Sequence, residues 1–378
     1  SFGKAGCGVR STGGRIGQTN YCSLMFSFRT TPLEAQLDKS LNEGKVGCFC
    51  NQNCFDTSTG EYMYEIFRKR GNLAHLFMPS STELTPGTDH IEFDQSDLEG
   101  LDALVVEIQD VGVRYFNFTR DVMRLLSMRA RMEEGPAIYI VDHINPLGRV
   151  VEGTMPVVDA DIWTPKVAHR HGLTLAELCN IYYDEIDGKF PLHVISAACS
   201  QSGRDIMPWT IAPSSDLPGM FSAAMYSGGG LWNNTTITPA IGTSRPYEYI
   251  GAPWINPSRT SNAPHPEDVI LRPCSFTPSA GRYEGLACRG YQIILKPGAQ
   301  YHSLLHTLEL MRFFMERYSQ FEMLPTLFTK VADPVIAEFL KGNITFDIVQ
   351  EHVKIEEQKW IRKAKRYTLY DETPYRIK

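Results

Sequence analysis

Short apolar runs alternate with amphipathic segments from residue 41 to about residue 200. Two of these runs, within residues 101–108 and 137–141, carry apolar residues at successive positions and not only at every second one. A strand with apolar side chains on both faces has to be covered on both faces, which is typical of a parallel sheet between layers of helices. The alternation therefore predicts an α/β fold with a Rossmann-like, mostly parallel sheet and helices on both faces.

The apolar spacing also divides the chain into parts. The predicted strands of the first part are residues 45–51, 73–78, 101–108, 137–141 and 192–196, and its predicted helices are residues 60–70, 118–133 and 174–186. A region denser in Gly, Pro and Ser follows, and it ends in a predicted strand at 290–296 and predicted helices at 301–318, 334–341 and 347–365. We therefore expect an N-terminal arm (residues 1–40), a Rossmann-like domain (41–200) and a smaller C-terminal α/β or α+β domain (201–378).

Length and charge limit the classes of protein that fit. A chain of 378 residues with 43% hydrophobic residues exceeds the roughly 250–300 residues at which single cores stop growing. Its net charge of −6 argues against nucleic acid as the main partner, since nucleic-acid binding needs a basic face. No apolar run approaches the roughly 18 residues of a membrane span. The sequence leaves the oligomeric state open.

The sequence gives no sign of a metal or nucleotide site. Cys48, Cys50 and Cys54 are closely spaced but lack a second pair of ligands, and we expect them to be buried core residues. His169 and His171 lack an evident third ligand. The phosphate-binding and dinucleotide-binding glycine motifs are absent, so we expect no cofactor.

Polar residues directly follow two of the predicted strands. Gln109, Asp110 and Arg114 come after the strand at 101–108, and Asp142 and Asn145 come after the strand at 137–141. Ligands of parallel sheets bind beyond the carboxyl ends of the strands, which makes these side chains candidates for a binding site. Asp110 or Asp142 could equally cap a turn or helix, and Arg114 could form a structural ion pair.

Several long blocks of the chain resemble the bacterial exo-β-N-acetylmuramidases, a family long catalogued only as a domain of unknown function. The resemblance extends over residues 40–370 and implies a Rossmann-like domain, a smaller second domain and a cleft between them. It also implies an exported bacterial protein of the periplasm or cell envelope, which removes terminal N-acetylmuramic acid from peptidoglycan fragments without a metal or nucleotide. The blocks that carry it are residues 44–47, 108–115, 145–148, 151–153, 171–174, 242–246, 250–254 and 366–370.

One departure from the family concerns its proposed catalytic acid. Members carry Ser-Pro-Glu-His-Gly after the strand at 73–78, and Ser80 stands here in place of that Glu. The segment between residues 79 and 104 is also shorter than in the family. Asp216 replaces the usual Asn of another block. Glu83 lies three residues beyond Ser80 and could take over the vacant position.

Glycoside hydrolysis needs one carboxylic acid to protonate the leaving oxygen and a second group as nucleophile or base. The resemblance makes Glu83 and Asp110 the candidate catalytic pair, with Arg114 or Arg245 binding the lactyl carboxylate of the sugar. Three functions remain open: an active glycosidase, a sugar-binding protein without hydrolysis, and a structural or interaction protein that retains only the fold. The candidate substrate-binding residues are Gln109, Arg114, Tyr115, Asp142, Asn145, His171, Asp216 and Arg245.

Overall fold

The computed structural model describes most of the chain beyond the N-terminal arm. The described residues are 39–56, 59–79, 93–157, 165–195, 211–259, 262–370 and 373–377. Glu83 and Ser80 lie outside them, as does the expected domain boundary at residues 200–201.

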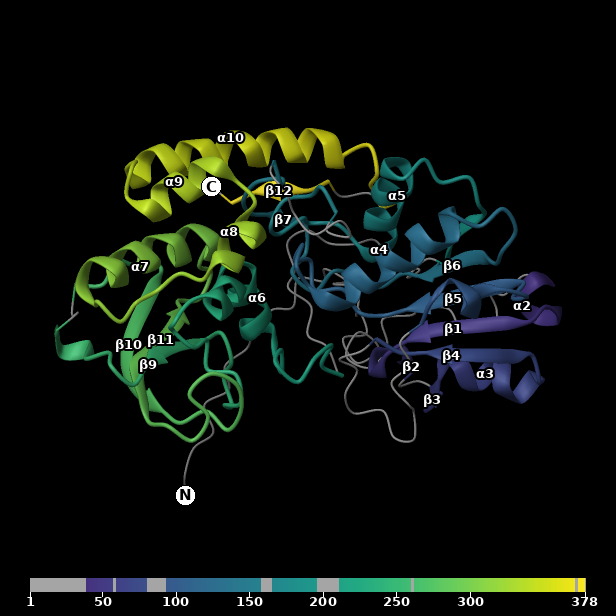
Figure 1. Ribbon diagram of the computed structural model, residues 1–378, viewed down its shortest axis with the longest axis horizontal. Coiled ribbons are helices and arrows are strands. Elements are labelled where there is room, and N and C mark those ends of the chain that lie inside the picture. Colours follow the sequence, from purple (N-terminus) through teal and green to yellow (C-terminus); the bar gives the residue numbers. More distant parts are fainter. Residues whose placement is uncertain are drawn as a thin grey trace, which may run out of the picture.

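A five-stranded parallel sheet forms the centre of the first domain (Figure 1). Its spatial order is β4-β1-β5-β6-β8. The strand β4, which follows β1 in the chain, therefore lies at the edge of the sheet, beside β1. This is the doubly wound order 2-1-3-4-5, in which the strand order reverses between β1 and β5. The strands are β1 (Val46–Cys50), β4 (Leu73–Phe77), β5 (Ala103–Glu107), β6 (Ala137–Val141) and β8 (Leu192–Ile195).

Alternate residues of these strands belong to two hydrophobic clusters. Leu104 and Val106 pack with α4 (Asn117–Ala130) and α5 (Leu175–Glu185). Ala103 and Val105 pack with α3 (Met63–Arg70) on the other side. The successive apolar residues are therefore explained by helices on both faces of the sheet, and the predicted fold class is confirmed.

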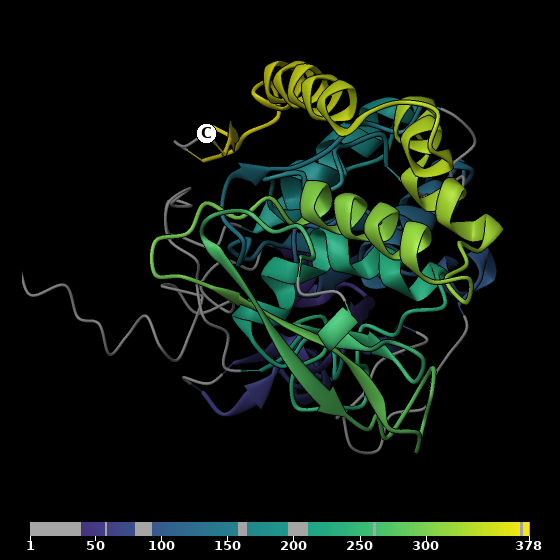
Figure 2. The ribbon, with the colours of Figure 1, turned by 90° about the vertical axis from the view of Figure 1, so that its left-hand side faces the viewer.

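The smaller domain contains a three-stranded antiparallel sheet in the order β10-β11-β9. These strands are β9 (Tyr249–Ala252), β10 (Val269–Phe276) and β11 (Cys288–Leu295). Figure 2, in which this domain faces the viewer, shows α7 above the long green strands. The helices of this part are α6 (Met220–Gly229), α7 (Ser303–Arg317), α8 (Pro325–Val331), α9 (Pro334–Lys341) and α10 (Phe346–Ala364).

The end of the chain returns to the first domain. The indole nitrogen of Trp360 on α10 donates to the carbonyl of His171, 2.9 Å away. Beyond α10, β12 (Tyr375–Arg376) pairs with β7 (Val150–Val151) in parallel. Figure 1 shows α10, in yellow, along the top of the molecule, above β7 and β12 and between the two sheets. The C-terminal segment therefore holds the two domains together.

Two smaller features lie next to the main sheet or within it. Short strands β2 (Phe55–Asp56) and β3 (Glu61–Tyr62) form a separate two-stranded sheet. Cys48, Cys50 and Cys54 are buried, unpaired and part of the hydrophobic core, as expected. Within the described ranges, no helix is both long and apolar enough to cross a membrane.

Candidate functional site

Buried polar side chains gather at the carboxyl ends of β1, β5 and β6. Asn51 and Gln52 follow β1 next to the reversal of strand order, and both are buried. The equally buried polar residues at the ends of β5 and β6 are Glu107, Gln109, Asp110, Asp142, His143 and Asn145. The parallel sheet thus brings together the polar residues that the sequence places after separate strands.

Asp110 is bound on both carboxylate oxygens. Its Oδ2 accepts from the backbone N–H of Gly112 at 2.8 Å, and its Oδ1 accepts from the hydroxyl of Thr119 at 2.6 Å. The ring nitrogen Nε2 of His171 lies 3.4 Å from Oδ2. These bonds fix the loop between β5 and α4. Asp110 therefore shapes the site, while its carboxylate is nearly inaccessible in this conformation.

Gln109 and Asn145 connect neighbouring loops through their amides. Gln109 donates to the carbonyl of Ile144, and Asn145 donates to the carbonyl of Leu173. The side-chain oxygen of Asn145 also accepts from the backbone N–H of Leu147. The loops after β5 and β6 are thereby held in one arrangement.

Asp142 lies at the end of β6, against the N-terminus of α5. Its oxygens accept from the backbone N–H of Ala176 at 3.0 Å and from the hydroxyl of Tyr370 at 2.8 Å. Burial raises the pKa of Asp142 to about 6, although these hydrogen bonds favour the ionised form. Asp142 thus anchors the end of β6 to α5 and to Tyr370, and its carboxyl group is fully buried.

Arg114 is only 1% exposed, and its guanidinium joins the two domains. Nη1 donates to the carbonyls of Thr154 and Val167 in the first domain. Nη2 donates to the carbonyls of Lys330 and Val331 at the end of α8 and lies 3.1 Å from a ring nitrogen of His169. Burial lowers the pKa of Arg114 to about 10, which leaves it charged at neutral pH.

Tyr115 lies where the smaller domain meets this edge, Asp216 lies near Tyr226 of α6, and Arg245 lies in the smaller domain shortly before β9. The hydroxyl of Tyr115 donates to the carbonyl of Ser227 on α6. Burial raises the pKa of Tyr226, and the nearby charge of Asp216 raises it further. The ring of Tyr226 packs edge to face on the ring of Tyr115. Arg245 is exposed and pairs with Glu248 at 2.8 Å.

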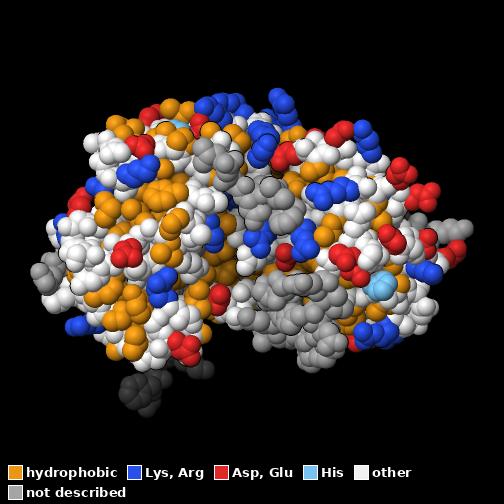
Figure 3. Space-filling model, viewed as in Figure 1, with side chains coloured by type: hydrophobic (Ala, Val, Ile, Leu, Met, Phe, Trp, Pro, Cys, Tyr) orange, Lys and Arg blue, Asp and Glu red, His pale blue; other side chains and the backbone are white. Residues whose placement is uncertain are grey.

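Two cationic side chains at this edge, those of Lys330 and Arg120, were not predicted from the sequence. Lys330, near the end of α8, is partly buried, and its ammonium lies 5.6 Å from the centre of the Tyr115 ring. Burial and the neighbouring Arg120 of α4 lower the pKa of Lys330. No carboxylate of the described residues pairs with Lys330. In Figure 3, Lys and Arg side chains gather in the hollow between the two lobes.

A buried contact between a carboxylate and a histidine was also missed. Glu107 at the end of β5 lies 3.0 Å from Nε2 of His143, which follows β6. A carboxylate inside an otherwise apolar strand is the sequence signal that points to it. No comparable signal marks Lys330, because only the fold brings α8 to the loop after β5. The described part of the chain places no three His, Cys, Asp or Glu side chains together as a metal site.

Comparisons with known proteins agree with this architecture. The family model described as exo-beta-N-acetylmuramidase NamZ, N-terminal, matches residues 88–220, and the corresponding C-terminal model matches residues 224–370. Peptidoglycan beta-N-acetylmuramidase NamZ of Bacillus subtilis (strain 168) is 27% identical over 287 residues, which cover 72% of this chain and 68% of that relative.

Solved structures show the same fold. Two DUF1343 family proteins from Bacteroides fragilis superimpose with TM-scores of 0.74 and 0.72, at 20% and 18% sequence identity. Each comparison covers 90% of this chain and 97% of the other. The arrangement of both domains is therefore shared with these proteins.

Proposed function

Because this chain belongs to the exo-β-N-acetylmuramidase NamZ family, we propose that it binds N-acetylmuramic acid at the end of a peptidoglycan fragment and hydrolyses the β-glycosidic bond. The proposed binding place is the carboxyl edge of the sheet, between the loop after β5 and helix α8. Such a function would place the protein in the periplasm or cell envelope, so export is part of the proposal.

The unpaired ammonium of Lys330 is the observation that carries this proposal. A partly buried cation next to Arg120 is unfavourable without an anion, since burial and like charge both oppose it. N-acetylmuramic acid brings a lactyl carboxylate, which N-acetylglucosamine lacks. Binding of that carboxylate would relieve the repulsion between Lys330 and Arg120 and form charge-assisted hydrogen bonds.

Tyr115 supports the same placement. Its ring lies beneath the Lys330 ammonium, and its hydroxyl is fixed by α6. An aromatic face of this kind offers apolar contact to a sugar ring beside the bound carboxylate. Arg114, one of the two arginines that we expected to bind the carboxylate, supports the site by holding the carbonyl of Lys330. Arg245 remains a second candidate for the carboxylate because it is exposed.

Glycoside hydrolysis requires two carboxyl groups, and we assign these roles to Glu83 as the acid and to Asp110 as the second carboxylate. The hydrogen bonds of Asp110 favour a second candidate function, which is sugar binding without hydrolysis. Its oxygens are engaged by Gly112 and Thr119, so catalysis would need the β5–α4 loop to rearrange. Asp142 is likewise buried and bound on both oxygens, so it too would need its surroundings to rearrange before it could exchange a proton with a substrate.

A chromogenic N-acetylmuramic acid glycoside tests the proposal. We expect slow turnover that is abolished by Glu83→Gln and retained by Asp89→Asn, a matched change in the same segment. Saturable binding without turnover would establish the second candidate. Absence of both turnover and binding would overturn the proposal and leave a structural or interaction protein.

A further inference from the structure

Helix α10 lies at the outer edge of the molecule. Its buried side chains share one face, which packs on the protein and includes Val353, Trp360 and Ala364. The opposite face is exposed, and Figures 1 and 2 both show α10 along the top of the molecule. The helix has 19 residues and is about 28 Å long, so its outer face is long enough to lie against a flat surface.

Aliphatic side chains lie on this outer face. Ile348 is 52% exposed, and Ile355 is 44% exposed. Their separation of seven residues is about two turns of an α-helix, so both side chains point to the same side. Single exposed aliphatic residues are common, but two that share a helix side with a group of cations form an amphipathic surface.

Cations occupy the other end of the same helix and the residues that follow it. Residues 359–366 include five Lys or Arg and no acid, in a chain whose net charge is −6. Lys359 pairs with Glu356 at 2.6 Å. Lys363 pairs with Glu185 of α5 at 3.2 Å. The three remaining cations are exposed and form no ion pair with the described residues: Arg362, Lys365 and Arg366.

The cations and the aliphatic side chains form one surface. Arg362 lies seven residues beyond Ile355 and therefore continues the line of Ile348 and Ile355. The carboxyl end of a helix attracts cations to its last turn, which accounts for Arg362 but not for the aliphatic side chains in line with it. Figure 3 shows Lys and Arg side chains projecting from the top of the molecule, where α10 lies.

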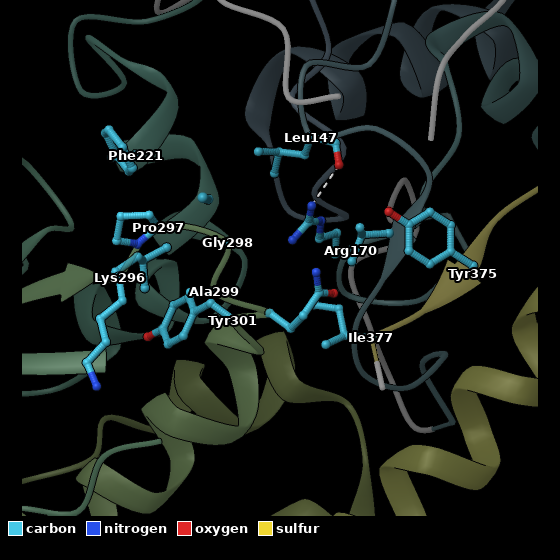
Figure 4. A pocket seen from close by; sticks show the side chains of 14 residues that line it. Leu147, Arg170, Phe221, Lys296, Pro297, Gly298, Ala299, Tyr301, Tyr375 and Ile377 are labelled. Carbon is cyan, nitrogen blue, oxygen red and sulfur yellow. Dashed lines mark hydrogen bonds between the residues drawn. The ribbon is translucent and has the colours of Figure 1, made fainter. Parts of the chain in front are cut away.

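These cations do not serve the cavity between α6 and the end of the chain. Figure 4 shows this cavity, and none of its described lining residues belongs to α10. The outer face of α10 thus combines unpaired positive charge with apolar surface and faces solvent. Clusters of about four to eight Lys or Arg on an amphipathic helix are typical of segments that bind anionic lipid.

We propose that the outer face of α10 binds a bilayer surface that contains anionic phospholipid. Arg362, Lys365 and Arg366 contact the lipid phosphates, while Ile348 and Ile355 enter the boundary between headgroups and acyl chains. A soluble polyanion would match the charge but offers no apolar phase to the aliphatic side chains. The proposed sugar site involves no residue of this face, so the inference stands apart from the proposed muramidase function.

Cosedimentation of the full chain with lipid vesicles tests the inference. We expect saturable binding to vesicles of phosphatidylglycerol and phosphatidylcholine, and at least about tenfold weaker binding to phosphatidylcholine alone. Each cation near an anionic surface strengthens binding by about fivefold, so the combined change Arg362→Gln, Lys365→Gln and Arg366→Gln should weaken it by at least about thirtyfold. Ile348→Ser together with Ile355→Ser should weaken it by about tenfold without changing the charge.

The control variant combines three changes on exposed residues of the smaller domain: Arg272→Gln, Arg282→Gln and Arg289→Gln. Net charge falls by the same amount as in the α10 variant. These residues lie on β10, on β11 and between the two strands, and Figures 1 and 2 show α7 between these strands and α10. Binding to the anionic vesicles should change by less than about twofold, because charges farther than about 10 Å from the lipid are screened at about 0.1 M salt.

Three outcomes would overturn the inference. The first is no saturable binding to the anionic vesicles. The second is an equal loss of binding in the α10 variant and in the control, which would make the attraction a property of net charge and not of α10. The third is full binding by the isoleucine variant together with equally tight binding of soluble polyphosphate, which would make the face a site for a polyanion and not for a bilayer.

Discussion

The guanidinium of Arg114 donates a hydrogen bond to the backbone carbonyl of Lys330, with Nη2 and the oxygen 2.9 Å apart. A second bond from the same nitrogen reaches the carbonyl of Val331 at 3.0 Å. These bonds tie the loop after β5 to the end of α8, although the two segments are far apart in the sequence. They hold the Lys330 ammonium above the ring of Tyr115.

Replacing Arg114 by Gln should destabilise the protein strongly. The variant leaves buried carbonyls of both domains without donors, and each unsatisfied group costs about 1–3 kcal/mol. We expect the free energy of unfolding to fall by at least about 3 kcal/mol in urea denaturation. Arg282→Lys, at an exposed position, should change it by less than about 0.5 kcal/mol. An Arg114→Gln variant as stable as this control would contradict the role of Arg114 in joining the domains.

Gly112→Ala should disturb the site through Asn145. Gly112 has a φ of 76°, and an added Cβ would lie 2.6 Å from Nδ2 of Asn145. We expect a loss of about 2–4 kcal/mol in unfolding free energy, from the backbone conformation and the clash together.

Gly60→Ala is the matched control for this prediction. Its φ of 77° is the same, but its Cβ would meet nothing within 4 Å. The control should therefore lose only about 1–2 kcal/mol, the cost of the left-handed backbone. Equal losses of unfolding free energy in the two variants would show that the side chain of Asn145 can move aside without a free-energy cost.

His302 should make stability depend on pH. Burial lowers the pKa of His302, but the hydrogen bond to Glu357 and the charges of Glu152 and Glu357 outweigh it, so that the pKa is raised above 6.5. The stabilisation is therefore fully present below the unfolded pKa of about 6.5 and is lost as pH rises through the folded pKa.

Unfolding measured at pH 6 and at pH 9 checks this sign. The stability difference between the parent and His302→Gln should be larger at pH 6 than at pH 9. A difference that grows with pH would contradict the arrangement of Glu152 and Glu357 around the ring.

The first domain could be predicted from the sequence because its strands carry a strong apolar signal. The predicted strand at 137–141 coincides with β6, and the predicted helix at 334–341 coincides with α9. Helix α6 was missed, since it ends in Gly228 and Gly229 and glycine disfavours helix. The fold requires small residues there: a Cβ on Gly228 would lie 2.3 Å from the carbonyl oxygen of Ser303. Packing against α7 thus overrides local propensity.

The site could be predicted only in part. Gln109, Asp110, Asp142 and Asn145 lie together at the edge of the sheet, as parallel strands require. Their hydrogen bonds show that they also shape the loops, and no sequence pattern reveals such bonds. Lys330 has no local signal, because its importance comes from contact with Tyr115 and Arg120 across the domain junction.

The central claim is that Lys330 recognises the carboxylate of N-acetylmuramic acid, and calorimetric comparison of two sugars tests it most directly. The methyl β-glycosides of N-acetylmuramic acid and N-acetylglucosamine differ by the lactyl group alone. We predict that the parent protein binds the acidic sugar at least about tenfold more tightly. Lys330→Met should bring the ratio close to one without loss of unfolding free energy. Equal affinities for the two sugars in the parent, or an unchanged ratio in Lys330→Met, would contradict the claim.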